Sequence, residues 1–283
     1  MPTFFINFAS QANKTMKTTA ILLAAGLVSF GARAFTTDTI SVNTALLSSP
    51  EKVVVIVPDK QPEKTSFPTV YLLNGYGGDH TSWLTVRPDL GELADEYGMV
   101  MVMPDGRDSW YWDSPVQPDM QMESFITKEL VPYIDANYPT LPVREKRAVT
   151  GLSMGGHGAL WLAANHPDLF GNAGAMSGGV DIRPFPGRWK MAQRLGSKEE
   201  FPERWENSTV ANCVPKLKEA GLNITFDCGK DDFFAAVNDN LHAALLEADV
   251  PHDYTSRPGK HTRTYWNNSI LYHLLFFNEA FNK

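Results

Sequence analysis

The stretch Ala148–Leu160 reads AVTGLSMGGHGAL and sets one serine, Ser153, among closely spaced glycines. A strand-like apolar run precedes the serine, and a helix-like run of small and apolar residues follows it. Gly151, Ser153 and Gly155 fit the pattern G-x-S-x-G, in which a strained strand–turn–helix holds a nucleophilic serine above the end of a sheet. A glycine-rich turn that only packs a helix onto a strand would have the same sequence pattern. The rest of the sequence is therefore needed to distinguish a nucleophilic serine from a structural one.

Short apolar runs alternate with helical patterns on both sides of this stretch. A hairpin is expected at Asp38–Thr44 and Lys52–Pro58, then strands at Thr69–Asn74, Met99–Pro104, Arg147–Ser153, Gly171–Gly178, Asn223–Gly229 and His252–Gly259. Helices are expected at Met120–Asn137, Gly156–Asn165, Asp239–Ala248 and Ser269–Phe281. This alternation predicts an α/β fold, with a mostly parallel sheet of about eight strands and helices on both faces.

Residues 180–210 break the alternation. They are rich in Pro, Arg and Trp and show no clear period. A long irregular insertion between core elements is typical of a lid or a substrate wall, although a plain surface excursion fits as well.

Composition narrows the class of protein. The chain has 283 residues and a formal net charge of -7, and no basic block interrupts it. One large domain is therefore expected, and nucleic acid is a poor candidate partner. Cys213 and Cys228 are the two cysteines. They could pair in an oxidising compartment, but a buried free thiol suits Cys228 equally well.

The N-terminal segment has the features of a signal peptide. A short basic region at Met16-Lys17 leads into the apolar core Ala20–Ala32, and Ala32–Ala34 gives a small-x-small cleavage pattern. We expect residues 1–34 to be removed as an N-terminal extension plus signal peptide, leaving 35–283 as one catalytic domain. The mature protein should be periplasmic or secreted and free of the membrane. A membrane anchor is the alternative, but the apolar stretch is short for a transmembrane span.

A serine nucleophile needs a base, and histidine is the usual one near neutral pH. Among the seven histidines, His261 lies just after the last predicted strand and before the last helix. Parallel sheets collect their reactive groups at the carboxyl ends of strands, so His261 is the predicted base. The acid should lie between Ser153 and His261, where FDCGKDDFF offers Asp227, Asp231 and Asp232. Asp227 is expected to be still within the strand. Residue chemistry alone does not show whether Asp231 or Asp232 is the acid.

An oxyanion hole needs two backbone N–H groups. Met154, directly after the nucleophile, should supply one. The glycine-rich loop within Leu72–Trp83 follows a predicted strand and should supply the other, with Tyr76 as the candidate donor. This loop fits neither glycine pattern that is typical of nucleotide-phosphate binding.

Several segments together resemble the "Putative esterase" family, the esterase D-like branch of the α/β-hydrolase fold. They are VYLLNGYGGDHTSW, PDGRDSWYWDSP, GLSMGGHGAL, DCGKDDFF and RPGKHTRTYWNNSILYHLLFF, and the resemblance covers roughly residues 40–280. It implies Ser153 as nucleophile, Asp232 as acid and His261 as base, with Tyr76 and Met154 as oxyanion donors.

This resemblance implies ester hydrolysis through an acyl-enzyme, without a metal or other cofactor. Many family members carry His where this chain has Asn74, a position that shapes the oxyanion loop and does not attack. Two alternatives stay open. One is an acyltransferase that passes the acyl group to a sugar hydroxyl, and the other is a non-catalytic carbohydrate-binding relative.

Aromatic residues indicate the substrate class. Trp110, Tyr111 and Trp112 follow a predicted strand end, and Trp189 lies in the irregular insertion. We expect these four residues to contact substrate, because aromatic side chains suit a sugar or an aromatic acyl group. Plain packing explains the first three equally well. The predicted substrate is a small-molecule or polysaccharide ester with a short or aromatic acyl group. S-formylglutathione is disfavoured, because its hydrolysis belongs in the cytosol.

Overall fold

The computed structural model describes residues 35–59 and 65–283, whose strands form one eight-stranded sheet in the order β1-β2-β4-β3-β5-β6-β7-β8. The β1–β2 and β2–β4 pairs are antiparallel, and all the other pairs are parallel. The strands are β1 Thr36–Val42, β2 Glu51–Val57, β3 Thr69–Leu73, β4 Val100–Pro104, β5 Arg147–Gly151, β6 Asn172–Met176, β7 Asn223–Gly229 and β8 Asp253–Arg257. The predicted α/β class and the predicted hairpin are both confirmed.

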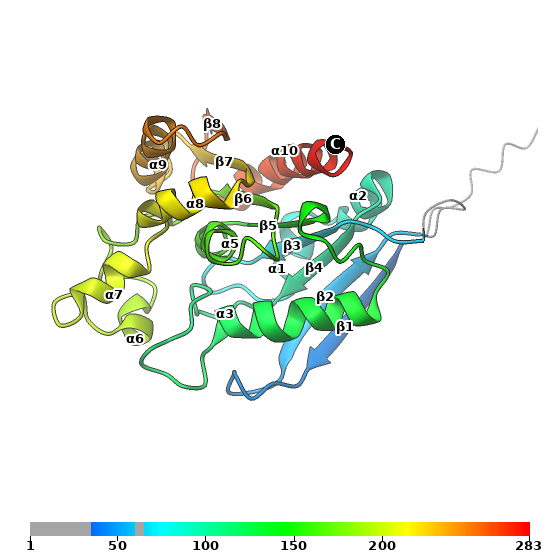
Figure 1. Cartoon of the computed structure of the whole chain (residues 1–283), viewed down its shortest axis with the longest axis horizontal. Helices are drawn as coiled ribbons and strands as arrows, with labels where there is room; N and C mark the ends of the chain where they lie inside the picture. The colour runs from blue at the N-terminus through cyan, green and yellow to red at the C-terminus, as the bar shows by residue number, and fades with distance from the viewer. Residues whose placement is uncertain (1–34, 60–64) are drawn as a thin grey trace, which may run out of the picture. The chain divides into compact units, whose positions relative to one another are not determined.

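Helices connect these strands (Figure 1). They are α1 Ser82–Val86, α2 Leu90–Tyr97, α3 Met122–Ser124, the π-helical turn η1 Phe125–Leu130, α4 Val131–Asn137, α5 Met154–Asn165, α6 Met191–Leu195, α7 Pro202–Asn207, α8 Val214–Ala220, α9 Ala235–Glu247 and α10 Arg263–Phe281. Two 3-10 turns are η2 Arg144–Lys146 and η3 Val210–Cys213. The helix expected at Met120–Asn137 is the continuous run of α3, η1 and α4. The insertion at 180–210 is less irregular than expected, because it contains α6 and α7.

Alternation along the strands separates two core layers. In β2, Val53 and Val55 face one layer, while Val54 and Ile56 face the other. Because successive side chains of a strand point to opposite faces, both faces of a buried strand must be apolar. Helices α4, α5, α8 and α9 supply the first layer, and α1, α2 and α10 supply the second.

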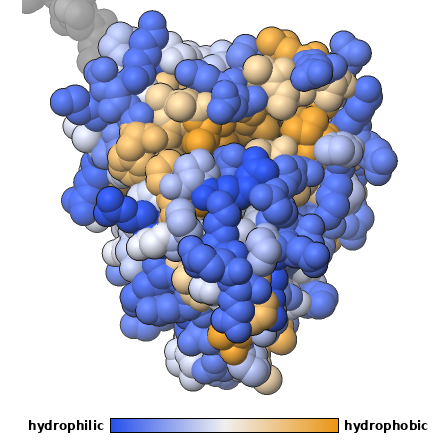
Figure 2. All heavy atoms as spheres, turned by 90° about the vertical axis from the view of Figure 1, so that its left-hand side faces the viewer, coloured by the Kyte–Doolittle hydropathy of each residue, from blue (hydrophilic) through white to orange (hydrophobic). Residues whose placement is uncertain are grey.

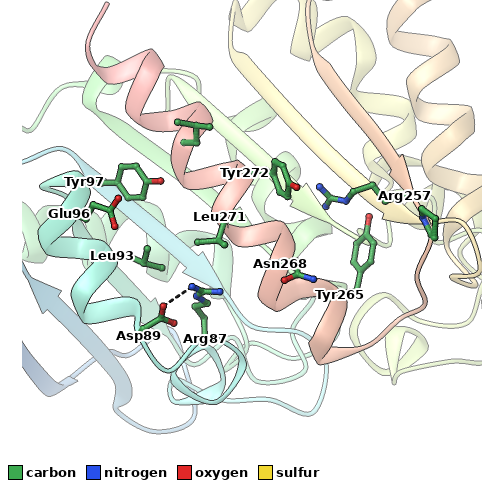
Figure 3. Close-up of a pocket in the computed structure, with 12 residues that line it drawn as sticks. Arg87, Asp89, Leu93, Glu96, Tyr97, Arg257, Tyr265, Asn268, Leu271 and Tyr272 are labelled. Atoms are coloured by element: carbon green, nitrogen blue, oxygen red, sulfur yellow. Dashed lines mark hydrogen bonds and ion pairs between the residues drawn. The ribbon is translucent and has the colours of Figure 1, made fainter.

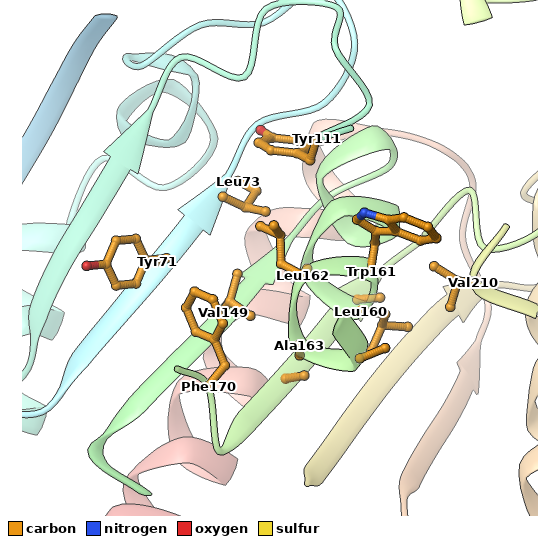
Figure 4. Packing of buried hydrophobic residues seen from close by; sticks show 14 of the residues in the cluster. Tyr71, Leu73, Tyr111, Val149, Leu160, Trp161, Leu162, Ala163, Phe170 and Val210 are labelled. Atoms are coloured by element: carbon orange, nitrogen blue, oxygen red, sulfur yellow. The ribbon is translucent and has the colours of Figure 1, made fainter. Parts of the chain in front are cut away.

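Helix α5 is apolar all round, as a helix buried on every side requires. Figure 4 shows Leu160 and Leu162 of α5 among the side chains of the first layer, together with Val149 of β5. Burial of each such side chain contributes roughly 1.5–3 kcal/mol. The helix that follows Ser153 is thereby held firmly against the sheet.

The sequence also raised the questions of a signal peptide, of a disulfide between the two cysteines and of a membrane-spanning helix. The predicted signal peptide lies outside the described residues. Cys213 and Cys228 are both free and buried. Within residues 35–59 and 65–283, no helix combines the length and the apolar character that a membrane crossing requires.

The turn at Ser153 depends on the close approach of three backbone segments. A Cβ atom on Gly155 would lie 2.3 Å from the carbonyl oxygen of Leu73 in β3, and one on Gly151 would lie 2.5 Å from the carbonyl carbon of Gly155. Backbone atoms cannot move aside as the end of a flexible side chain can, so only glycine fits at both positions. Helix α5 can therefore begin directly over the ends of β3 and β5.

Replacement of Gly155 by alanine tests this constraint. Alanine normally favours a helix by about 1 kcal/mol over glycine, but here its methyl group would meet backbone. We expect Gly155→Ala to lower the free energy of unfolding by about 1–3 kcal/mol, measured by urea denaturation. Gly187→Ala is the matched control, because a Cβ there meets no atom within 4 Å. Equal stability of the two variants would contradict the close approach.

Candidate active site

Ser153 occupies the sharp turn between β5 and α5. Its backbone has φ 56° and ψ −115°, a region that non-glycine residues adopt only when the surrounding structure enforces it. Its N–H donates to the Met176 carbonyl at 2.9 Å, and its carbonyl accepts from the Gly179 N–H at 3.2 Å. Strand β6 and the segment after it thus hold the turn, and the serine lies at the N-terminus of α5.

His261 lies in the loop between β8 and α10, with Nε2 2.9 Å from Ser153 Oγ. Its ring packs against Phe233 at 4.3 Å between centroids and against Trp266 at 4.9 Å. The imidazole and the hydroxyl therefore lie side by side although they come from distant parts of the sequence. These aromatic contacts restrict rotation of the ring.

Asp232 completes the hydrogen-bonded chain. Its two carboxylate oxygens lie 2.8 and 3.0 Å from His261 Nδ1, and Oδ1 also accepts from the Phe234 N–H at 2.8 Å. The carboxylate is completely buried. A carboxylate can only accept, so the proton of a neutral His261 sits on Nδ1 and the lone pair of Nε2 faces Ser153.

The loops that carry Asp232 and His261 are joined by their backbones. The Lys230 N–H donates to the Arg257 carbonyl at 2.8 Å, and the Asp231 N–H donates to the Gly259 carbonyl at 2.9 Å. Asp231 points into solvent, which separates it from its neighbour Asp232. The sequence left Asp231 and Asp232 as alternatives for the acid, and the turn after β7 places Asp232 against His261.

Asp227 belongs to a different, buried cluster, as its expected place within the strand implies. It accepts from Ser269 Oγ at 2.7 Å, lies 3.0 Å from His273 Nε2 and pairs with Arg257 at 3.2 Å. His273 Nδ1 lies 2.8 Å from Thr150 Oγ1. This second imidazole–carboxylate pair ties β5, β7, β8 and α10 together beneath the candidate site.

His157, one helical turn after Ser153, is also buried. Its ring nitrogens face the backbone carbonyls of Trp110, at 3.2 Å, and Ser208, at 3.0 Å. Burial lowers the pKa of His157 to about 4, against the smaller opposing effect of these two contacts. The ring is neutral near pH 7, so it carries one N–H and can donate to only one of these two carbonyls.

A cleft of about 600 Å³ opens over Ser153 and His261. Gly75 and Tyr76 of the glycine-rich loop line one side. Three aromatic side chains, from Trp189, Phe233 and Trp266, line it as well. Trp189 and Phe233 stack with their ring planes 24° apart. Helices α6 and α7 of the insertion lie at the left of Figure 1, and the face at that end carries a band of apolar surface above a mainly polar region (Figure 2).

Four aromatic residues were expected to contact substrate, and the structure places them differently. Trp189 lines the cleft, but Trp110, Tyr111 and Trp112 are buried and are absent from the cleft lining. The prediction for those three residues is therefore wrong. Trp110 and Tyr111 both have positive φ, and this reversal of the backbone turns their side chains into the core. Conversely, Phe233 and Trp266 line the cleft although no sequence pattern predicted them there. Their only local signal is their closeness in sequence to Asp232 and His261.

The candidate oxyanion donors lie where the loop and the helix meet Ser153. Met154 is the first residue of α5, so its N–H has no acceptor within the helix. Tyr76 lines the cleft three residues after the end of β3. Its neighbour Gly75 lies so close to the nucleophile that a Cβ there would be 3.4 Å from Ser153 Cβ.

A larger cavity, of about 780 Å³, lies between α2 and α10 (Figure 3). None of its lining residues belongs to the Ser153, His261 and Asp232 chain. Its two guanidinium groups are already paired: Arg87 with Asp89 at 2.6 Å, and Arg257 with Asp227 at 3.2 Å. In the described part of the chain, no group of three or more His, Cys, Asp or Glu side chains could hold a metal ion.

The chain is similar to several known esterases. The chain is 26% identical to an acetyl esterase of Caldicellulosiruptor saccharolyticus, over 82% of this chain and 94% of the relative. It is 28% identical to an S-formylglutathione hydrolase of Bos taurus, over 71% and 78% of the two chains. A solved structure of a ferulic acid esterase superposes with a TM-score of 0.74 at 25% identity, over 87% of this chain and 99% of the other. The family model described as "Putative esterase" matches residues 44–277, so the chain belongs to this esterase family of α/β-hydrolases.

Proposed function

We propose that this serine esterase hydrolyses its substrate through an acyl-enzyme on Ser153, with His261 as general base and Asp232 as the acid that orients it. One observation carries the proposal: the hydrogen-bonded chain from Ser153 Oγ to His261 at 2.9 Å and on to buried Asp232 at 2.8 Å, at the floor of an open cleft. A hydroxyl, an imidazole and a carboxylate in this order form the arrangement that activates serine in unrelated hydrolases.

The reaction has two steps, acylation of Ser153 and hydrolysis of the acyl-enzyme. Ser153 Oγ attacks the acyl carbon and passes its proton to His261 Nε2, while the Tyr76 and Met154 N–H groups donate to the oxyanion. The tetrahedral intermediate collapses, the bond to the alcohol oxygen breaks, and His261 returns the proton to that oxygen. Water then attacks the acyl-enzyme with His261 again as base, which releases the carboxylic acid and restores the serine.

We further propose short-chain or aromatic acyl esters as substrates, such as those on acylated polysaccharide. The stacked Trp189 and Phe233 rings, with Trp266 nearby, offer apolar faces suited to an aromatic acyl group or a sugar. Thr81, Ser82 and Thr85 line the same cleft and offer hydroxyls to a polar alcohol portion. The likeness to an acetyl esterase and to a ferulic acid esterase supports the same class.

Hydrolysis of p-nitrophenyl acetate, butyrate and octanoate and of methyl ferulate tests the proposal. We expect Ser153→Ala to lower kcat by about 10⁶-fold, because it removes the nucleophile, and Asp232→Asn to lower kcat by about 10⁴-fold, because it removes the orienting charge. Ser256→Ala, an exposed change on β8, should retain full activity. Turnover by Ser153→Ala equal to that of the wild type would refute the acyl-enzyme.

The same assays distinguish the remaining alternatives. Faster release of acetate or ferulate from acylated xylan than of formate from S-formylglutathione supports the proposed substrate class, and the reverse order contradicts it. Formation of a new sugar ester when a sugar acceptor is added would identify an acyltransferase. If a correctly folded wild type turns over none of these esters, a carbohydrate-binding role without catalysis is the better account.

We also propose that the enzyme is exported and loses residues 1–34. The proposal rests on the basic, apolar and small-residue order of that segment alone. Expression of the full chain in a Gram-negative host, followed by N-terminal sequencing of the periplasmic protein, should give Phe35 as the first residue. Recovery of an uncleaved chain only in the cytosol would contradict export.

A further inference from the structure

Asn74 is a fully buried polar residue at the point where β3 gives way to the glycine-rich loop. Its side-chain oxygen accepts from the Gly106 N–H at 2.8 Å and lies 3.0 Å from the Tyr111 hydroxyl. Its Nδ2 donates to the Gly75 carbonyl at 3.1 Å. A backbone N–H can only donate, so the contact with Gly106 fixes which end of the amide carries the oxygen.

The contact with the Gly75 carbonyl also orients the next N–H group. The Gly75 carbonyl and the Tyr76 N–H belong to one planar trans peptide, so they point in opposite directions. Asn74 Nδ2 holds this carbonyl at 3.1 Å, and the Gly78 N–H holds it at 3.0 Å. Rotation of the peptide would break both hydrogen bonds. The direction of the Tyr76 N–H beside Ser153 is therefore set by these two contacts, of which the one from Asn74 comes from a residue that does not line the cleft.

Tyr111 fixes Asn74 in turn. Its hydroxyl lies 3.0 Å from Asn74 Oδ1 and 3.1 Å from the Asn74 carbonyl oxygen. Its ring is fully buried against α5, so tightly that a Cβ on Gly158 would lie 2.2 Å from it. Figure 4 shows Tyr111 near Leu73, at the end of β3. The phenol thus connects the helix that carries the nucleophile to the residue that orients the loop.

We propose that Asn74 and Tyr111 are positioning residues of the oxyanion hole, which keep the Tyr76 N–H directed at the charge that develops on the substrate. The inference rests on the proposed function, because it takes Tyr76 as an oxyanion donor. Neither side chain touches the reacting atoms. Their effect should therefore appear in the stabilisation of the tetrahedral state and leave binding of the ground state unchanged.

Two variants test this role. Tyr111→Phe removes one hydroxyl and keeps the ring, and Asn74→Ala removes the amide. We expect kcat to fall about tenfold for Tyr111→Phe and about 100-fold for Asn74→Ala, with KM within about twofold of wild type. The inhibition constant of a phenylboronic acid, which forms a tetrahedral adduct on serine, should rise by the same factors. Burst titration would count active sites, so that misfolded protein does not lower the measured kcat.

Tyr71→Phe is the matched control, because it removes a buried phenol oxygen from β3 in the same core layer, outside the cleft. It should leave kcat and boronate inhibition unchanged. If Asn74→Ala fails to fold, Tyr111→Phe decides alone. Unchanged kcat in Tyr111→Phe, or a fall in kcat without weaker boronate binding, would overturn the positioning role. Failure of the proposed function would look different: wild type and Ser153→Ala would then hydrolyse esters equally.

Discussion

The contact of backbone with backbone where α5 crosses the ends of β3 and β5 is the constraint on which the candidate site depends. Gly151 and Gly155 permit that contact, because any Cβ there would meet main-chain atoms. Ser153 can then adopt a positive φ that the surrounding hydrogen bonds enforce. A serine in an ordinary turn would rotate freely, whereas this one is directed at a fixed point above the sheet.

The other participants reach that point because parallel strands end at a common edge. The loops after β7 and β8 bring Asp232 and His261 there, and two backbone hydrogen bonds join those loops. Beneath them, Asp227, His273 and Arg257 connect the same strands to α10. The site therefore has a rigid base, which suits chemistry that gains most from groups oriented before the substrate arrives.

Much of this could be predicted from the sequence because the decisive signals are local. Glycine spacing marked Ser153, and position after a strand marked His261. The predictions that failed concern features that long-range packing decides. Whether Trp110 points into the cleft or the core is decided by a backbone reversal that no residue pattern announces. Helices α1 and α2 were not predicted, because five and eight residues are too few for a clear helical period. The contacts of Asn74 join segments 32 and 37 residues away.

The central claim is that Ser153 attacks the substrate while the Tyr76 and Met154 N–H groups receive the oxyanion. A crystal structure of the enzyme after reaction with a fluorophosphonate tests it most directly, since the phosphonyl group mimics the tetrahedral intermediate. The account predicts phosphorus bonded to Ser153 Oγ and the phosphonyl oxygen about 2.7–3.1 Å from both amide nitrogens. Phosphorus on another residue, or an oxygen directed away from both amides, would contradict it.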